Sequence, residues 1–286
     1  MSFILRSLLF VPADSERKIA RALASEADVV ILDLEDSVAL PRKDEARRLA
    51  AEALQRRGGK KLFLRINGLT SGFADADIEA ALQGRPDGIV LPKSRSGRDV
   101  LRLAGIVGAA LPVIAIATET ASSLLDMGSY SATGANLLGL AWGGEDLSVD
   151  LGAESNRDGE GRYADPYRLA RTLCLIGARA ANVEPIDAVH TAYRDLEGLE
   201  EEARAAARDG FTAKLAIHPD QVPVINRVFT PTQSDVDRAR RIVTAFADAG
   251  NAGVIGLDGE MLDVPHLRRA ERILARAGLK AGTDVQ

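Results

Sequence analysis

Short apolar runs alternate with helix-like segments along most of this chain, and this alternation constrains its fold more than any other feature. Eight such runs are each closed by polar residues or by proline. A continuous apolar run of this kind is typical of a strand that is covered on both faces. The runs lie at residues 6–11, 29–34, 62–66, 88–91, 112–117, 137–142, 186–189 and 213–217. Eight strands that alternate with helices predict an α/β fold, specifically a (β/α)8 TIM barrel.

The chain continues well beyond the eighth run. Residues 234–249 have the pattern of a capped amphipathic helix, a glycine-rich stretch follows, and residues 265–277 have a second helical pattern. A chain of 286 residues with 46% hydrophobic residues can bury the core of one barrel. We therefore expect residues 1–230 to form the barrel and residues 231–286 to form a C-terminal helical extension. This extension packs on the barrel or on a neighbouring subunit.

The composition excludes several classes of partner. Lys and Arg total 36 against 41 Asp and Glu, and the net charge of -5 gives no general attraction to nucleic acid or to anionic membranes. The N-terminal stretch is apolar but is interrupted by Arg6 and Pro12, so it has neither a signal-peptide layout nor the length to span a bilayer. Cys174 is the only cysteine, and its apolar helical surroundings are typical of a buried side chain. We expect a cytoplasmic protein.

Polar and ionisable residues follow the predicted strands at their carboxyl ends, where the catalytic groups of a (β/α)8 barrel lie. They are Asp14, Glu35, Asp36, Arg65, Asn67, Lys93, Glu119, Asp146, Asp187 and His218. Loops are polar in any α/β protein and acids commonly cap helices, so a single residue of this kind also has a structural explanation. Several charges attached directly to buried strands favour a functional site.

Two successive strands end in acids that suit a metal ion. Gly143 and Gly144 permit a tight turn after the sixth run, and Asp146 follows them, while Glu119 follows the fifth run. If these strands are parallel neighbours, Glu119 and Asp146 converge on one Mg²⁺ ion, which prefers one or two carboxylates together with water and substrate oxygens. The alternative is that both acids cap helices.

Arg65 lies within a predicted strand, where a charge is costly unless it meets a partner. It is either half of a buried ion pair or the receptor of an anionic substrate. A guanidinium binds a carboxylate through two parallel hydrogen bonds, so Arg65 beside a cation suits a substrate with a carboxylate and an adjacent oxygen. Glu35, Asp36 and Lys43 fit a set of groups that orient metal-bound water and substrate. Their alternative role is a surface ion pair.

Other cofactors and catalytic arrangements are not indicated. The glycines in GGEDLSVDLG match neither a dinucleotide-binding pattern nor a P-loop, which excludes NAD and ATP as expected cofactors. The 3 histidines share no ligand spacing, so we expect neither zinc nor a Ser-His-Asp arrangement at His218.

Several segments together resemble the citrate lyase beta subunit-like family, which malyl-CoA and citramalyl-CoA lyases also resemble. In chain order they are RSLLFVPADS, VVILDLEDSV followed by KDEAR, LFLRINGL, IVLPKS, ATETASSLL, AWGGEDLSVDLG, AVHTAYRDLEGL, DGFTAKLAIHPDQV and DGEMLDVPHLRRA. These segments cover nearly the whole chain. The GGEDL segment and the KxxIHPxQ-type segment make the resemblance specific.

The resemblance implies a Mg²⁺-dependent carbon–carbon lyase that cleaves or forms a 3-hydroxy-3-carboxyacyl thioester, such as citryl-CoA, malyl-CoA or citramalyl-CoA, by retro-Claisen chemistry. By motif position, Glu119 and Asp146 match the family's Mg²⁺ ligands, and Arg65 matches its substrate-carboxylate arginine. Asp263 matches an aspartate that some members donate in trans as the acid that protonates the acetyl-CoA enolate. The resemblance also implies a homotrimer or hexamer in which the C-terminal segment reaches the neighbour's active site.

Two departures from the family pattern leave the acyl carrier, CoA or an acyl-carrier protein, open. Ala13 stands where many members have Gly after the Pro, and Ala213 replaces the usual Gly before the Lys of the IHP segment. Both changes can narrow a loop that meets the CoA chain. Arg17 and Lys18 are candidate contacts for the CoA phosphates. Two other functions stay open, namely a class II pyruvate-type aldolase that acts on free hydroxy-keto acids and a non-catalytic subunit that binds a keto acid.

Overall fold

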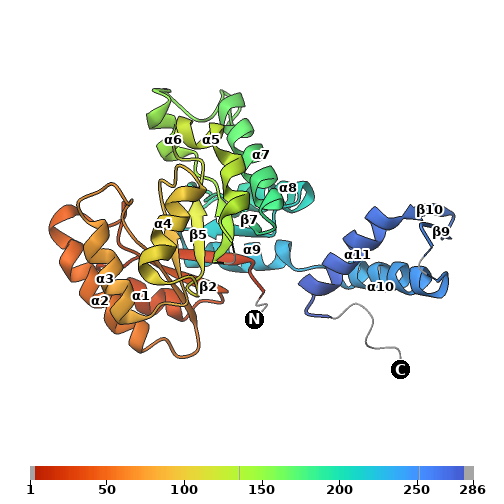
Figure 1. Ribbon diagram of the computed structural model, residues 1–286, viewed down its shortest axis with the longest axis horizontal. Coiled ribbons are helices and arrows are strands. Elements are labelled where there is room, and N and C mark those ends of the chain that lie inside the picture. Colours follow the sequence, from red (N-terminus) through yellow and green to blue (C-terminus); the bar gives the residue numbers. More distant parts are fainter. Residues whose placement is uncertain (1–3, 135, 251, 280–286) are drawn as a thin grey trace. The chain divides into compact units, whose positions relative to one another are not determined.

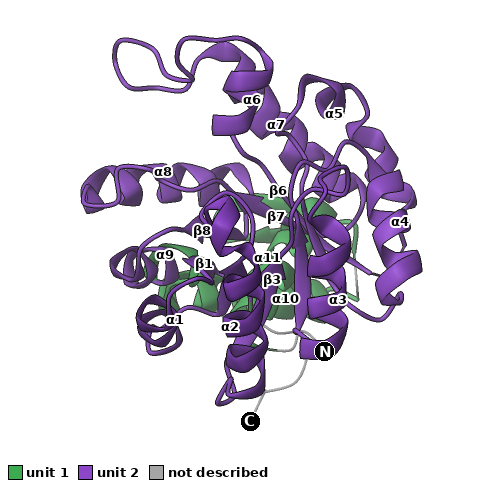
Figure 2. Ribbon diagram, turned by 90° about the vertical axis from the view of Figure 1, so that its left-hand side faces the viewer, with its two compact units in different colours: residues 1–4, 227–286 green, residues 5–226 purple. Residues whose placement is uncertain are grey.

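The computed structural model describes residues 4–134, 136–250 and 252–279. These residues form two compact units, one from Leu5 to Asn226 and one that contains the chain from Arg227 onward (Figure 2). The larger unit contains the barrel strands, and the smaller one contains the C-terminal helices. The division after Asn226 lies close to the expected boundary at residue 230.

Strands β1 to β8 of the larger unit are all parallel, and they close into a barrel because β8 pairs with β1. Their bounds are Ser7–Pro12 (β1), Val29–Asp33 (β2), Lys61–Arg65 (β3), Gly88–Leu91 (β4), Val113–Ile116 (β5), Leu137–Ala141 (β6), Glu184–Asp187 (β7) and Ala213–Ala216 (β8). The (β/α)8 TIM barrel prediction is confirmed. The seventh strand differs most from its expected position, because its pairing with β6 begins at Glu184 rather than at Ile186.

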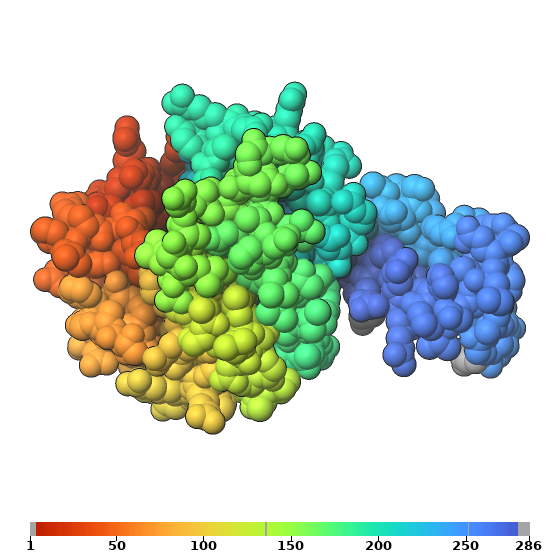
Figure 3. Space-filling view, turned by 90° about the horizontal axis from the view of Figure 1, so that it is seen from above, coloured from red at the N-terminus to blue at the C-terminus, as the bar shows by residue number. Residues whose placement is uncertain are grey.

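Helices follow the strands of the larger unit (Figure 1). They are Glu16–Leu23 (α1), Lys43–Gln55 (α2), Ala74–Gly84 (α3), Gly97–Val107 (α4), Ala121–Leu125 (α5), Glu145–Asp150 (α6), Asp165–Ala180 (α7), Leu196–Asp209 (α8) and Val222–Phe229 (α9). Helix α2 illustrates why they form, because its buried residues Ala46, Leu49, Ala50 and Ala53 recur at helical spacing on one face. The surface of this unit follows the chain order from red through green to cyan, as expected when each β/α unit lies beside the previous one (Figure 3).

Helices α5 and α6 are not expected from the sequence. A helix of five or six residues has too few apolar positions to show a helical period. Both helices begin just past a strand, after Glu119 and at Glu145, so they determine the direction in which the chain leaves the barrel mouth. None of the helices in the described part of the chain has the length and apolar character needed to cross a membrane.

The smaller unit contains α10 (Gln233–Asp248), an antiparallel hairpin of β9 (Val254–Leu257) and β10 (Glu260–Asp263), and α11 (Val264–Arg276). Buried side chains of α10, β10 and α11 form a hydrophobic core within it. The sequence analysis expected only a glycine-rich stretch where the hairpin lies. Asp258 and Gly259 form its turn with φ angles of 53° and 82°, and this Asp-Gly pair is the signal that could have predicted it.

Close packing inside the barrel leaves no room for a side chain at Gly88 of β4. A Cβ atom there would lie 2.3 Å from the ring of Phe63 on the neighbouring strand β3. We therefore expect Gly88→Ala to lower the free energy of unfolding by about 1–3 kcal/mol, measured by urea denaturation. Gly105→Ala in α4 is the matched control, because no atom lies within 4 Å of its added Cβ. The control should be neutral or more stable, and equal stability losses in both variants would contradict this account.

Candidate active site

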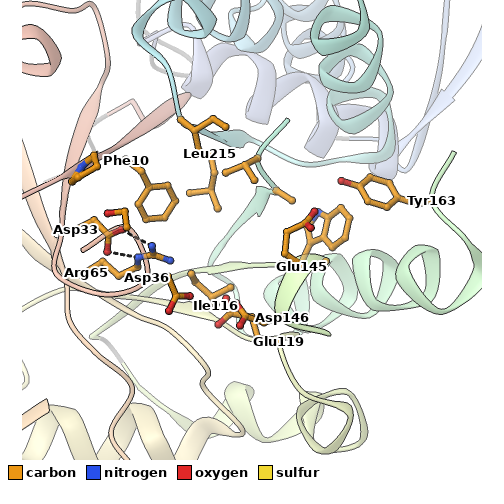
Figure 4. Close-up of a pocket in the computed structure, with 18 residues that line it drawn as sticks. Phe10, Asp33, Asp36, Arg65, Ile116, Glu119, Glu145, Asp146, Tyr163 and Leu215 are labelled. Atoms are coloured by element: carbon orange, nitrogen blue, oxygen red, sulfur yellow. Dashed lines mark hydrogen bonds and ion pairs between the residues drawn. The ribbon is translucent and has the colours of Figure 1, made fainter. Parts of the chain in front are cut away.

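A cavity of about 320 Å³ opens at the carboxyl ends of the barrel strands (Figure 4). Its wall includes the last residues of β1, β2, β3 and β5, namely Pro12, Asp33, Arg65 and Ile116, and residues just after β6, β7 and β8. The predicted site residues Asp36, Arg65, Glu119 and Asp146 all line it. Neighbouring parallel strands present their carboxyl ends at the same edge, so residues far apart in sequence meet in this cavity.

Glu119 and Asp146 lie side by side in the cavity wall (Figure 4). The strands that carry them, β5 and β6, are parallel neighbours as the metal hypothesis requires. Gly143 makes this approach possible, because a Cβ at that position would lie only 3.2 Å from Glu119 Cγ. Neither acid is a helix N-cap, since Thr120 caps α5 and Gly144 precedes α6. The alternative that both acids cap helices is therefore wrong.

The Glu119 carboxyl is buried, with 5% of the residue exposed. Burial raises its pKa to about 8, the nearby charge of Glu35 acts in the same direction, and the backbone N–H of Lys93 opposes them. That N–H donates a hydrogen bond to Glu119 Oε2. A carboxyl with this pKa keeps its proton at neutral pH unless a cation replaces it.

Arg65 forms a buried ion pair and also lines the cavity. Its Nε and Nη2 atoms donate to the two oxygens of Asp33, at 2.6 and 2.5 Å, across the β2–β3 register. Its Nη1 atom lies 3.0 Å from Glu35 Oε2, and its guanidinium packs over the ring of Phe10. Burial acts to lower the pKa of Arg65, but the charge and hydrogen bonds of Asp33 outweigh it and raise the pKa. The ion-pair role is thus confirmed, and the role of Arg65 as a receptor for an anionic substrate stays a prediction.

Asp33 also lines the cavity, although no role was predicted for it from the sequence. It is the last residue of β2, it is fully buried, and its side chain also accepts a hydrogen bond from the backbone N–H of Glu35. Burial acts to raise the pKa of Asp33, but the Arg65 guanidinium holds it below its usual range. An acid inside an apolar run is the sequence signal, because such a position requires a partner when it is buried.

Lys93 connects the acids at the mouth. Its ammonium nitrogen lies 2.5 Å from Glu35 Oε1, 3.0 Å from Asp36 Oδ2 and 3.4 Å from Asp146 Oδ1. Burial acts to lower its pKa, but the hydrogen bond and charge of Glu35 outweigh this effect and raise it. Lys93 follows a predicted strand, but no role was predicted for it from the sequence.

Lys43 is placed differently from the other predicted residues. It is buried, and its ammonium donates hydrogen bonds to the carbonyls of Leu34 and Glu35 and to Asn67 Oδ1. It does not line the cavity. This location favours a role in holding the chain around Glu35 rather than the predicted contact with substrate. The alternative of a surface ion pair is wrong for Lys43, because only 6% of the residue is exposed.

The remaining predicted residues do not line this cavity. Arg17 and Lys18 are exposed in the first turn of α1. Asp263 belongs to the smaller unit, where it caps α11 and its Oδ1 atom lies 2.6 Å from Nδ1 of His266. His218 begins a short 3-10 turn and its ring accepts a hydrogen bond from the N–H of Asp220.

Two aromatic residues also line the cavity, and buried polar residues behind the wall hold one of them in place. Trp142 and Tyr163 line it, with their ring centroids 4.9 Å apart. Trp142 Nε1 donates a 2.7 Å hydrogen bond to Asp187, which also accepts from Lys214 Nζ at 2.6 Å. This buried contact holds Trp142 directly beside the Gly143–Gly144 turn. No role was predicted from the sequence for Trp142, Tyr163 or Lys214, because their contacts join segments that are far apart in the chain.

The charges at the mouth fit a divalent cation. Five carboxylates, those of Asp33, Glu35, Asp36, Glu119 and Asp146, are grouped with the cationic side chains of Arg65 and Lys93. The buried Lys43 ammonium also attracts Asp33, Glu35 and Asp36. The buried Glu35 Oε2 atom has no aligned hydrogen-bond donor among the described residues, so it can accept from a metal-bound water. The described side chains offer no group of three or more His, Cys, Asp or Glu arranged around a metal. Two carboxylates with open positions suit Mg²⁺ rather than a closed structural site.

Comparisons with known proteins give the family. Residues 6–219 match the HpcH/HpaI aldolase/citrate lyase family, and residues 171–280 match a family of C-C bond lyases of the TIM-barrel fold. A citrate lyase subunit beta-like protein of Mycobacterium tuberculosis is 38% identical over 272 residues, with 94% of each chain covered. A (3S)-malyl-CoA thioesterase of Cereibacter sphaeroides is 35% identical over 280 residues, covering 95% of this chain and 94% of the relative.

A solved structure agrees with this assignment. The crystal structure of the protein CitE from Mycobacterium tuberculosis, in complex with magnesium, acetoacetate and coenzyme A, matches with a TM-score of 0.81 and 36% identity. The match covers 96% of this chain and 98% of that one. With its barrel, the acids and arginine at its mouth, and these similarities over nearly its full length, the chain belongs to the HpcH/HpaI aldolase/citrate lyase family.

Proposed function

We propose that the protein is a Mg²⁺-dependent carbon–carbon lyase that cleaves or forms a 3-hydroxy-3-carboxyacyl thioester, such as citryl-CoA, malyl-CoA or citramalyl-CoA. The products of cleavage are a keto acid and an acyl thioester. The observation that carries the proposal is the meeting of Glu119, Asp146 and Arg65 in one cavity at the barrel mouth. The magnesium, acetoacetate and coenzyme A bound by the similar CitE structure support this choice of cofactor and substrate class.

Glu119 and Asp146 would hold the Mg²⁺ ion. Glu35 Oε2, which pairs with Arg65 Nη1 but accepts no aligned hydrogen bond, would accept one from a metal-bound water. When bound, the ion supplies positive charge that stabilises oxygen anions of the reacting molecule. Burial of Glu119 keeps bulk water away from this charge, which makes each electrostatic contact stronger than at the surface.

Arg65 would bind the substrate carboxylate with the N–H groups that Asp33 and Glu35 leave available. The two bonds from Asp33 fix the plane of the guanidinium before substrate arrives. A fixed fork orients a carboxylate, so the carbon–carbon bond to be broken can be aligned with the thioester π system. The apolar wall, including Phe10 and Ile116, would face the uncharged part of the substrate.

The remaining parts of the proposal concern a second copy of the chain and the CoA moiety. Asp263 would act in trans as the acid that protonates the acetyl-CoA enolate, in a homotrimer or hexamer. The 46% exposure of its side chain leaves it accessible to such a partner. Arg17 and Lys18, exposed on α1, would contact the CoA phosphates.

A panel of substrates tests the function and separates it from its rivals. With Mg²⁺, citryl-CoA, malyl-CoA or citramalyl-CoA should yield a keto acid and an acyl-CoA, and a Glu119→Gln, Asp146→Asn double variant should lose at least about a thousandfold in kcat/KM. Release of free CoA without a keto acid would instead indicate a thioesterase like the Cereibacter relative. Cleavage of only free hydroxy-keto acids would indicate an aldolase, and binding of oxaloacetate or glyoxylate without turnover would indicate a non-catalytic subunit. Full lyase activity of the double variant in chelator would refute the metal assignment.

Magnesium affinity should increase with pH up to about 8. Because burial and Glu35 raise the pKa of Glu119 to about 8, metal binding below that pH must displace a proton. The dissociation constant should therefore fall by up to about tenfold between pH 6 and pH 7 and level off above pH 8. Isothermal titration calorimetry in buffers of different ionisation enthalpy measures both the affinity and the released proton. A dissociation constant that is constant from pH 6 to pH 8 would contradict the role of Glu119.

Arg65→Lys should mainly weaken binding of the keto acid in the condensation direction. Lysine keeps the charge but lacks the planar fork, so KM should rise about tenfold to a hundredfold with a smaller change in kcat. Steady-state kinetics with saturating acyl-CoA measure this. Arg57→Lys is the matched control, because Arg57 pairs with Asp87, which precedes β4 at the amino end of the barrel. An unchanged KM in the Arg65 variant would show that this arginine serves its ion pair alone.

A further inference from the structure

Lys93 occupies an unusual position at the carboxyl end of β4. Its φ angle is 50°, in the left-handed region that side chains other than glycine rarely adopt. In this conformation its backbone N–H donates to Glu119, while its ammonium contacts Glu35, Asp36 and Asp146. A single residue thus contacts both of the proposed metal ligands, one through its main chain and the other through its side chain. Backbone strain maintained at such a place indicates a functional constraint.

We propose that Lys93 is the internal counter-ion of the metal site. Its ammonium holds the acidic cluster together before a divalent cation binds, and it repels that cation at Asp146. The inference rests on the proposed function and adds a determinant of metal affinity to it. Lys93 thereby sets the affinity of the site below the value that its carboxylates alone would give.

The charge balance of the cluster supports this role. Glu35 is buried and Asp146 is partly buried, so their mutual repulsion is poorly screened by water. The ammonium of Lys93 is the cation that contacts Glu35, Asp36 and Asp146 together, whereas Arg65 is engaged mainly by Asp33. A Mg²⁺ ion at Asp146 would lie near this ammonium, and two positive charges that share one carboxylate repel each other.

The effect of the Lys93 charge can be tested separately from the hydrogen bond that its main chain makes to Glu119. The hydrogen bond to Glu119 comes from the backbone N–H, so a substitution of the side chain leaves that donor in place. Lys93→Met removes the charge at similar length, Lys93→Gln removes it but keeps a hydrogen-bond donor, and Lys93→Arg keeps the charge. The comparison of Lys93→Met and Lys93→Gln with Lys93→Arg therefore tests the positive charge of this side chain.

Calorimetric titration with MgCl₂ at pH 9, where Glu119 is ionised, tests the proposal. Lys93→Met and Lys93→Gln should bind Mg²⁺ about tenfold or more tightly than the unchanged protein, and Lys93→Arg should stay within about threefold of it. In EDTA the two neutral variants should melt at a lower temperature than the unchanged protein, and saturating Mg²⁺ should remove that difference. If Lys93→Met does not fold in EDTA, Lys93→Gln purified with Mg²⁺ is measured by competition with a chelator.

Equal or weaker Mg²⁺ binding by both neutral variants would overturn the proposal, since Lys93 would then assist the metal rather than oppose it. A melting temperature in EDTA that is unchanged in both would overturn the counter-ion role. The unchanged protein distinguishes this failure from failure of the proposed function. If neither the unchanged protein nor its Glu119→Gln, Asp146→Asn variant binds Mg²⁺, the metal site itself is refuted.

Discussion

An excess of buried negative charge at the barrel mouth is the constraint on which the site depends. Carboxylates from the ends of β2, β5 and β6 meet there, and water is largely excluded from Glu35 and Glu119. Such a group is stable only with cations beside it. Arg65 neutralises Asp33 from the next strand, Lys93 connects three of the acids, and a divalent ion would complete the balance. The same imbalance that makes the mouth costly to fold suits it to a divalent cation.

The buried polar contacts below the mouth keep these charges in place. Lys43 holds the carbonyls of Leu34 and Glu35, and Asn67 joins it to the fully buried Asp77. On the other side of the site, the contact of Trp142 with Asp187 holds the turn that leads to Asp146. These residues act through their hydrogen bonds, and the Lys43 ammonium also attracts the carboxylates of Asp33, Glu35 and Asp36. They fix the chain from which the functional side chains project, which is the support that a preorganised site requires.

Much of the fold followed from the sequence, and the site followed in part. The apolar runs predicted all the barrel strands because a strand buried on both faces is apolar at most of its positions. Glu119, Asp146 and Arg65 were predicted to converge because the carboxyl ends of neighbouring parallel strands share an edge. The hairpin of the smaller unit and the short helices α5 and α6 were missed, since their apolar patterns are too short to be distinguished from loops.

The sequence by itself determined the barrel and the acids and arginine at its mouth, because strand burial and strand order are local properties that repeat along the chain. Tertiary structure alone decided which charge meets which. Arg65 bonds Asp33, and Lys93 rather than Lys43 reaches the acids, because Lys43 is taken up by backbone carbonyls. The partner of a side chain depends on which strands lie next to each other once the barrel has closed. No spacing along the sequence records those distances.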